Sequence, residues 1–367
     1  MKIAAIDVFQ VTYSLLDQKY SWSNDLYITN IVSSIIRVST DDGREGYGEV
    51  CPLGSAYMDA FAKGVPAAIA EFGPGLIGMD PLQLNLLNDR MNLALGGHNY
   101  AKSPIDIACW DILGQVSGLP VATLMGGRYR DGVPPYRAIS QRKPEEMTQD
   151  VLKYREMGYR RFQLKVGGNA NEDIERIRQC RAVLERDDIL VADANTGWLP
   201  HEALRVVNGV RDIDVYIEQP CATLEECLVV RRNTSLPFIL DELIRGTVPL
   251  VEAHKQGAMD VVNLKISRLG GLTKAKGVRD LCQSLGIAMT LEDSWGGDIT
   301  TTAIAHFAGS TRAEHYFTAT DFNSYVDIEL ASNAPRMKDG LLPIPSAPGL
   351  GITVHEERLG DPVLRVS

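Results

Sequence analysis

Five short apolar runs, spaced 23 to 28 residues apart, each end in a charged residue. They read RFQLK, ILVAD, DVYIE, PFILD and DVVNLK, and they end at Lys165, Asp193, Glu218, Asp241 and Lys265. This spacing accommodates one strand, one helix and two short loops, so the runs predict a ladder of β-α units. Because parallel strands end at a common edge, one polar residue at the C-terminal end of each strand also predicts an active site there.

The ladder extends in both directions. VPPYRAIS ends near Ser140, GIAMTLED ends near Asp293 and EHYFTATD ends at Asp321, which makes eight strand candidates. Amphipathic stretches such as residues 172–187 lie between them, with apolar residues close to helical spacing. Eight parallel strands with intervening helices close most naturally into a TIM-type barrel. An open doubly wound sheet is the alternative fold, but no GxGxxG follows any strand candidate.

The first part of the chain has a different pattern. KIAAIDVFQVTY and TNIVSSIIRVSTDDGREGYGEV alternate like antiparallel strands with a DDG turn, and two helical stretches follow. We therefore predict an α+β module over residues 1–125 and the α/β barrel over 126–335. A tail over 336–367, rich in proline and glycine, is expected to fold back on the first module.

Charge and composition exclude several classes of protein. A net charge of −10 without a Lys/Arg cluster argues against a nucleic-acid partner. No run of eighteen apolar residues exists, and Asp7 interrupts the first apolar stretch, so neither a membrane partner nor a signal peptide is predicted. The six cysteines form no CxxC pair, which is typical of reduced thiols in a cytoplasmic protein.

Three successive strands are expected to end in carboxylates, Asp193, Glu218 and Asp241. Oxygen ligands of this kind suit a hard cation, and Mg²⁺ is the expected cofactor. Asn195 and Glu242 follow close by as supporting polar groups. No histidine lies at a comparable strand end, which disfavours zinc or iron as the metal. The alternative for each carboxylate alone is that it caps the following helix, but three adjacent strands ending alike favour the metal site.

The two lysines are predicted to face each other. In a closed barrel of eight strands, the second and sixth lie on opposite sides of the mouth, so Lys165 and Lys265 flank a substrate held by the cation. A buried lysine near a cation can act as a base. Two bases on opposite faces of the α-carbon of a carboxylate can invert that centre, or eliminate water in the anti sense, through an enediolate. The alternative is that each lysine only pairs with a metal-ligand carboxylate.

These residues resemble the enolase superfamily, in its muconate-lactonising and mandelate-racemase-like branch. The resemblance covers nearly the whole chain and implies an N-terminal α+β capping domain, a modified TIM barrel, (β/α)7β, and a tail returning to the cap. It implies that Asp193, Glu218 and Asp241 bind Mg²⁺ and that Lys165 and Lys265 are the acid/base groups. The lysine-x-lysine motif of the family reads Gln163-Leu164-Lys165 here, which disfavours lactonising or dipeptide-epimerising roles. A homo-oligomer is also implied.

Further motifs narrow the branch. Five segments look like those of enzymes that act on proline-type imino acids: NLALGGHNYAKSPIDIACWD, LKVGGN, IEQPC, LKISRLGGL and EDSWGGDI. The expected small-molecule reaction is dehydration of cis-3-hydroxy-L-proline to a pyrroline-2-carboxylate. The alternative is 2-epimerisation of proline, hydroxyproline betaine or proline betaine. Betaine epimerases are expected to hold the quaternary ammonium by cation–π contact with a tryptophan on the eighth strand, where this chain has Phe322.

Several weaker candidates for substrate contact follow from this resemblance. A secondary ammonium prefers a carboxylate, which Asp293, Asp298 or Asp321 is expected to supply, and Trp295 is expected to wall the pocket. From the loops of the cap we add Trp22, Ser55 and Tyr57, because such loops close barrel mouths.

Two other classes of function stay open. A non-catalytic barrel that binds a metal-chelated ligand is disfavoured by the presence of both lysines. A sugar-acid dehydratase typically carries a His-Asp pair on the later strands, where this chain has Lys265.

Overall fold

The computed structural model describes residues 1–367, and its largest element is a parallel sheet of eight strands that pair in chain order. These strands are β7 (Arg137–Ile139), β8 (Arg161–Lys165), β9 (Ile189–Asp193), β10 (Tyr216–Glu218), β11 (Phe238–Leu240), β12 (Val261–Lys265), β13 (Ala288–Glu292) and β14 (Tyr316–Ala319). The sheet curls until its first and last strands meet, because Pro135 forms a parallel bridge with Ala319 and Tyr136 N donates to Ala319 O at 2.8 Å. The predicted barrel is therefore confirmed.

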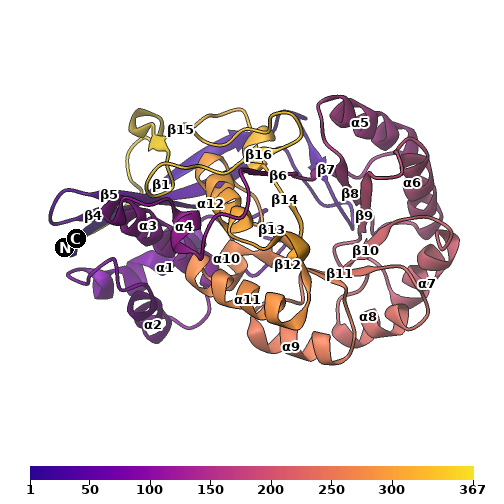
Figure 1. The fold of residues 1–367 in the computed structure, drawn as a ribbon, viewed down its shortest axis with the longest axis horizontal. Coiled ribbons are helices and arrows are strands. Elements are labelled where there is room, and N and C mark those ends of the chain that lie inside the picture. The colour runs from indigo at the N-terminus through magenta and orange to yellow at the C-terminus, as the bar shows by residue number, and fades with distance from the viewer.

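Helices connect successive strands on the outside of the barrel (Figure 1). They are α5 (Pro144–Glu156), α6 (Ala170–Ala182), α7 (Pro200–Gly209), α8 (Leu224–Arg231), α9 (Thr247–Lys255), α10 (Ile266–Leu269) with α11 (Leu272–Leu285), and α12 (Asp298–Gly309). Local sequence fixes where some of them begin. The Asn169 side chain accepts from the N–H groups of Asn171 and Glu172, and Thr223 Oγ1 accepts from Glu226 N, so both cap a helix. No helix combines the length and apolar composition needed to cross a membrane.

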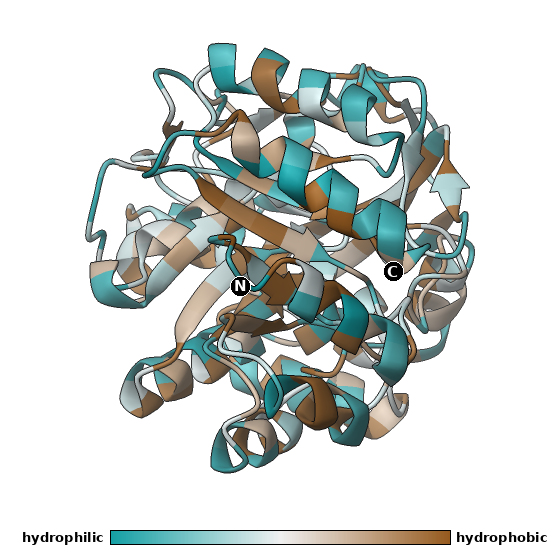
Figure 2. Ribbon diagram, turned by 90° about the vertical axis from the view of Figure 1, so that its right-hand side faces the viewer, coloured by the Kyte–Doolittle hydropathy of each residue, from teal (hydrophilic) through white to brown (hydrophobic).

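Burial explains why the strands are so apolar. Every residue of β12 is buried, since the helices cover one face of the sheet and the barrel interior covers the other. Figure 2 shows the same contrast, with hydrophobic strands at the centre and hydrophilic segments along the surrounding helices. The polar residues at the strand ends are thus exceptions in an apolar environment.

The N-terminal capping domain contains a four-stranded antiparallel sheet in the order β18 (Leu364–Val366), β1 (Ile3–Ser14), β4 (Asn30–Thr40) and β5 (Glu45–Val50). Its helices are α1 (Gly64–Phe72), α2 (Leu84–Ala94) and α3 (Asn99–Ser117). Strand β18 comes from the C-terminal tail and pairs with β1, so both termini lie together at the cap end of the molecule (Figure 1).

The remaining elements are short. They are α4 (Val121–Leu124), the strands β2 (Tyr20–Ser21), β3 (Tyr27–Ile28), β6 (Gly132–Val133), β15 (Ala331–Ser332), β16 (Leu342–Pro343) and β17 (Thr353–Val354), and the 3₁₀ turns η1 (Gly73–Leu76), η2 (Ala313–His315), η3 (Phe322–Ser324) and η4 (Glu356–Arg358).

Two buried carboxylates of the cap bind the N-termini of barrel helices. Glu49 accepts from Gly297 N and Thr300 N, both at 2.8 Å, at the start of α12. It also accepts from two hydroxyls of the cap, Tyr13 Oη at 2.8 Å and Ser33 Oγ at 2.7 Å. Asp106 accepts from Thr273 N at 2.9 Å, in the first turn of α11. Because a carboxylate is stabilised by the free N–H groups and dipole of a helix N-terminus, these contacts fix the cap on the barrel mouth.

Candidate active site

A narrow cavity, with about 370 Å³ of space between its atoms, lies where the C-terminal strand ends meet the cap. The lining residues are Tyr20, Trp22, Leu53, Tyr57, Tyr136, Ala138, Gln163, Lys165, Asn195, Lys265, Glu292, Asp293, Ser294, Trp295 and Phe322. Both predicted lysines therefore reach one space, from strands separated by three others in the ring.

Lys165 and Asp193 occupy paired positions at the ends of β8 and β9. The Lys165 ammonium donates to Asp193 Oδ2, and Asp193 Oδ1 accepts from Asn195 N at 2.9 Å. Burial alone would lower the pKa of Lys165, but the charge and hydrogen bond of Asp193, together with the nearby Tyr20 and Glu218, outweigh burial and the pKa is raised. In this structure the pair is an ammonium and a carboxylate.

Glu218, at the end of β10, is held by two amides. Gln163 Nε2 donates to one carboxylate oxygen at 2.9 Å, and Asn263 Nδ2 donates to the other. Burial raises the pKa of Glu218, and the charges of Asp193 and Asp241 raise it further. The three carboxylates are therefore close enough to repel one another.

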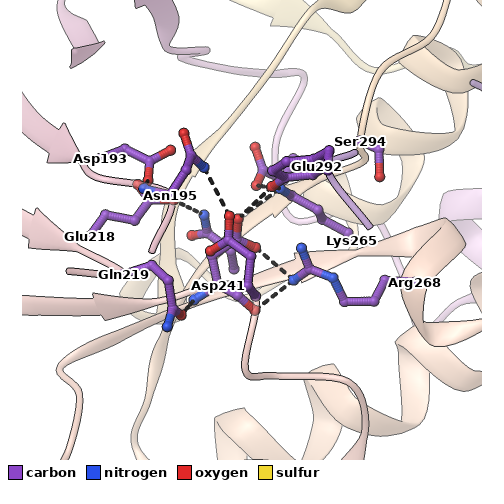
Figure 3. A network of polar contacts seen from close by, with 12 residues as sticks. Asp193, Asn195, Glu218, Gln219, Asp241, Lys265, Arg268, Glu292 and Ser294 are labelled. Carbon is purple, nitrogen blue, oxygen red and sulfur yellow. Dashed lines mark hydrogen bonds and ion pairs between the residues drawn. The ribbon is translucent and has the colours of Figure 1, made fainter. Parts of the chain in front are cut away.

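Asp241 directly follows β11 and is surrounded by donors (Figure 3). Lys265 Nζ and Arg268 Nη1 each donate to its carboxylate at 2.7 Å, and Tyr57 Oη, from the cap, donates at 3.0 Å. Burial favours protonation of Asp241, but Arg268 and Lys265 more than offset this effect and its pKa is lowered. Asp241 is thus a permanent anion beside Lys265.

The predicted metal ligands are turned toward these partners. No three acidic, histidine or cysteine side chains are spaced as a metal-binding group in this structure. Lysine and arginine side chains neutralise Asp193 and Asp241, and two side-chain amides donate to Glu218.

The donor set nevertheless fits a hard cation. All three carboxylates are buried, and two further oxygens nearby, Asn195 Oδ1 and Glu242 Oε2, have no hydrogen-bond donor. Asn195 Nδ2 donates to the other oxygen of Glu242 at 2.9 Å. Burial, followed by the charges of Asp241 and Asp193, raises the pKa of Glu242 to about 7. Buried, mutually repelling oxygen ligands of this kind are stabilised by a divalent cation.

The predicted aromatic contacts mostly lie at the cavity. Trp22, Tyr57, Trp295 and Phe322 line it, and the rings of Trp295 and Phe322 stack with centroids 5.3 Å apart and planes 26° apart. Ser55 is exposed and is not among the lining residues. The structure therefore builds an aromatic wall but does not bring Ser55 to it.

The predicted carboxylates for a substrate ammonium are engaged elsewhere. Asp293 lines the cavity, but its oxygens accept from Ser267 N at 2.9 Å, from the Ser267 hydroxyl and from Ser294 N at 2.6 Å. Asp298 accepts from the backbone N–H groups of residues 330 and 331 and from Asn323 and Arg336 side chains, and Asp321 accepts from Tyr159 Oη at 2.6 Å. Neither Asp298 nor Asp321 lines the cavity.

Sequence reasoning missed several residues of the site, above all Glu292. GIAMTLED was expected to end near Asp293, but β13 ends at Glu292, which pairs in register with Lys265. A shift of one residue turns the opposite side chain toward the interior. The signal was the alternation of Thr290 and Glu292, since Asn263 and Lys265 alternate in the same way on β12. Tyr20, Tyr136, Asn263 and Arg268 were also missed.

Comparison with known proteins finds similarity along nearly the whole chain. Residues 29–126 match the N-terminal domain of the mandelate racemase / muconate lactonizing enzyme family, and residues 146–358 match the family described as enolase C-terminal domain-like. A cis-3-hydroxy-L-proline dehydratase of Roseibium aggregatum is 54% identical over 367 residues, which covers 100% of both chains.

More distant relatives have other activities or a bound metal. An N-succinyl-L-Arg/Lys racemase of Bacillus cereus is 29% identical, over 98% of this chain and 97% of the relative. Among solved structures, a mandelate racemase/muconate lactonizing enzyme of Roseovarius nubinhibens, complexed with magnesium, superimposes with a TM-score of 0.97 at 34% identity, covering 100% of both chains.

Proposed function

Since the chain belongs to the mandelate racemase/muconate lactonizing enzyme family of the enolase superfamily, we propose that it dehydrates cis-3-hydroxy-L-proline to a pyrroline-2-carboxylate. The observation that carries this proposal is the position of Lys165 and Lys265, which line one cavity from opposite sides of the barrel. The relative that shares 54% of its residues over the full length is a dehydratase for this substrate, which supports the choice.

We assign Lys265 as the base for the α-proton and Lys165 as the acid for the leaving hydroxyl. In cis-3-hydroxy-L-proline the hydroxyl and the carboxylate share a ring face, so the α-hydrogen lies on the other face. Lys265 in its amine form takes the α-proton, and the electrons of the C–H bond move into the carboxylate as an enediolate. Collapse of the enediolate breaks the C3–O bond while Lys165 donates a proton to the departing oxygen, and water leaves.

Asp193, Glu218 and Asp241 are the proposed ligands of Mg²⁺, with Gln163, Asn195 and Glu242 as supporting residues. A bound divalent cation supplies positive charge that neutralises these carboxylates and acidifies the α-hydrogen of a carboxylate substrate. Gln163 and Asn263 orient Glu218, and Arg268 orients Asp241, through the hydrogen bonds described above.

The test is proton NMR of an imino-acid panel in deuterated buffer with MgCl₂. The panel contains cis- and trans-3-hydroxy-L-proline, L-proline and proline betaine. We expect water loss from the cis isomer alone, and slow α-proton exchange with L-proline, which has the same acidic hydrogen but no leaving group. If the enzyme leaves cis-3-hydroxy-L-proline intact and rapidly inverts proline betaine, the protein is a 2-epimerase, which uses the same two lysines.

A further inference from the structure

Glu292 is a buried carboxylate that the mechanism above does not use. It ends β13, its side chain is 2% exposed, and it lines the cavity together with both lysines. The Tyr136 hydroxyl donates to Oε2, whereas Oε1 has no hydrogen-bond donor. The nearest cation to Oε1 is Lys265 Nζ, at 3.6 Å, which is too long for a hydrogen bond.

An unpaired carboxylate oxygen in such an environment needs a cation or a donor. Burial raises the pKa of Glu292, and the positive charge of Lys265 opposes that effect. Leaving a buried acceptor without a donor costs free energy, so Oε1 is placed to accept from a donor that enters the cavity. The only other carboxylate that lines the cavity, Asp293, already accepts from Ser267 and Ser294.

The position of Glu292 relative to Lys265 identifies the missing group. The two residues are register partners on adjacent strands, and Figure 3 shows their side chains side by side. Lys265 must approach the α-carbon of the substrate, and the ring nitrogen is bonded directly to that carbon. A group beside Lys265 is therefore within reach of the nitrogen.

We propose that Glu292 Oε1 accepts a hydrogen bond from the protonated ring nitrogen of the substrate, and that Glu292 thereby selects cyclic secondary ammonium substrates. This inference rests on the proposed function, since it takes an imino acid as the ligand. A quaternary nitrogen has no N–H to donate, and a ring oxygen has neither the charge nor the proton. Tyr136 positions the carboxylate through the hydrogen bond to Oε2. A charge-assisted hydrogen bond in a buried site is among the stronger polar contacts in proteins.

The experiment is a binding cycle with two proteins and two ligands. Wild-type protein and Glu292→Gln, both loaded with Mg²⁺, are titrated calorimetrically with L-proline and with (S)-tetrahydrofuran-2-carboxylate, in which oxygen replaces the ring ammonium. We expect Glu292→Gln to weaken L-proline binding tenfold or more, in line with the loss of a charged hydrogen bond, and to change binding of the oxygen analogue less than twofold. Equal weakening of both ligands, or of neither, would overturn the proposal.

Two further variants separate this role from others. Tyr136→Phe keeps the charge of Glu292 but removes the hydrogen bond that positions its carboxylate. It should therefore weaken L-proline binding by a smaller factor than Glu292→Gln does, and leave binding of the oxygen analogue unchanged. Asp111→Asn, which removes a buried carboxylate on α3 far from the cavity, should leave the preference between the two ligands unchanged. If Glu292→Gln slows α-proton exchange of L-proline without changing either affinity, Glu292 acts on Lys265 and the proposal is wrong.

The binding cycle and the dehydration assay can fail separately. If wild-type protein does not consume cis-3-hydroxy-L-proline but the binding cycle shows the expected coupling, the proposed function fails and the ammonium site stands. If it dehydrates the substrate and the cycle shows no coupling, the function stands and the ammonium site fails.

Discussion

His306 makes the stability of this protein sensitive to acid. It lies on α12, is fully buried and uses both ring nitrogens. Ala122 N donates to Nδ1 at 3.2 Å, so Nδ1 is an acceptor, and Nε2 lies 3.0 Å from Leu350 O, so Nε2 carries the proton. Burial lowers the pKa of His306 from 6.5 to about 4. A second proton would charge the core and break the hydrogen bond from Ala122.

The sign and size of the effect follow from these values. In the unfolded chain the histidine binds its proton near pH 6.5, whereas in the folded protein it does so only near pH 4. Between these values the unfolded state holds more protons, so the free energy of unfolding falls as the pH falls through this window. Since one pKa unit corresponds to about 1.4 kcal/mol, protonation of His306 in the unfolded state should lower the free energy of unfolding by about 2 kcal/mol between pH 7.5 and pH 5.0.

Urea unfolding at a series of pH values, followed by tryptophan fluorescence, measures this loss. In His306→Gln, the amide oxygen can accept from Ala122 N and the amide nitrogen can donate to Leu350 O, but the side chain cannot be protonated. We expect the variant to be less stable than wild type at pH 7.5. At pH 5.0 its free energy of unfolding, relative to that of wild type, should be higher by about 2 kcal/mol than at pH 7.5. Other titrating groups contribute equally to both proteins and cancel.

The control is His254→Gln, which changes an exposed histidine on α9 and should follow the wild-type curve. Parallel stability curves for wild type and His306→Gln across this pH range would refute the reasoning.

Three other predictions concern the site and its support. Protein stripped with EDTA should lose turnover and recover it with Mg²⁺, because Asp193, Glu218 and Asp241 otherwise repel one another; full turnover in excess EDTA would exclude the metal. Lys165→Ala and Lys265→Ala should each lower kcat by about a hundredfold or more, as loss of a general acid or base commonly does, and near wild-type turnover in either variant would contradict the two-base mechanism. Glu49→Ala leaves Tyr13 Oη, Gly297 N and Thr300 N without an acceptor, so urea unfolding should show a loss of about 3 kcal/mol or more in the free energy of unfolding, whereas a loss below about 1 kcal/mol would mean that the carboxylate does not hold the two parts together.

Much of the barrel could be predicted from the sequence because strand period and strand ends are local properties. The runs ending at Lys165, Asp193, Glu218 and Lys265 end at those residues in the structure. On β13 the expected end was one residue late, and the error turned attention to Asp293 and away from Glu292. The local signal that favours Glu292 is its alternation with Thr290, which matches the alternation of Lys265 with Asn263 on the neighbouring strand.

The roles of the remaining acids depend on contacts between distant segments. Three further acids were expected to bind the substrate because of their residue type and position in the sequence. In the structure, Asp293 and Asp298 accept from backbone N–H groups, and Asp321 accepts from a tyrosine hydroxyl. Hydrogen bonds to the backbone of another segment leave no periodic trace in the sequence. The same holds for Tyr57, a cap residue that meets Asp241 and Lys265 only after the two parts assemble.

The two helix N-termini held by Glu49 and Asp106 also limit how this scaffold can be redesigned. Both helices border β13: α11 leads into it and α12 follows it, and Glu292 and Trp295 lie at its C-terminal end. A cap transplanted from a relative to introduce new specificity loops would have to bring acceptors at these two places, or the helix ends would be left without partners. Chimeras that exchange only the loops near residues 20–24 and 52–58 avoid that cost, so they are the natural unit of exchange in directed evolution of this fold.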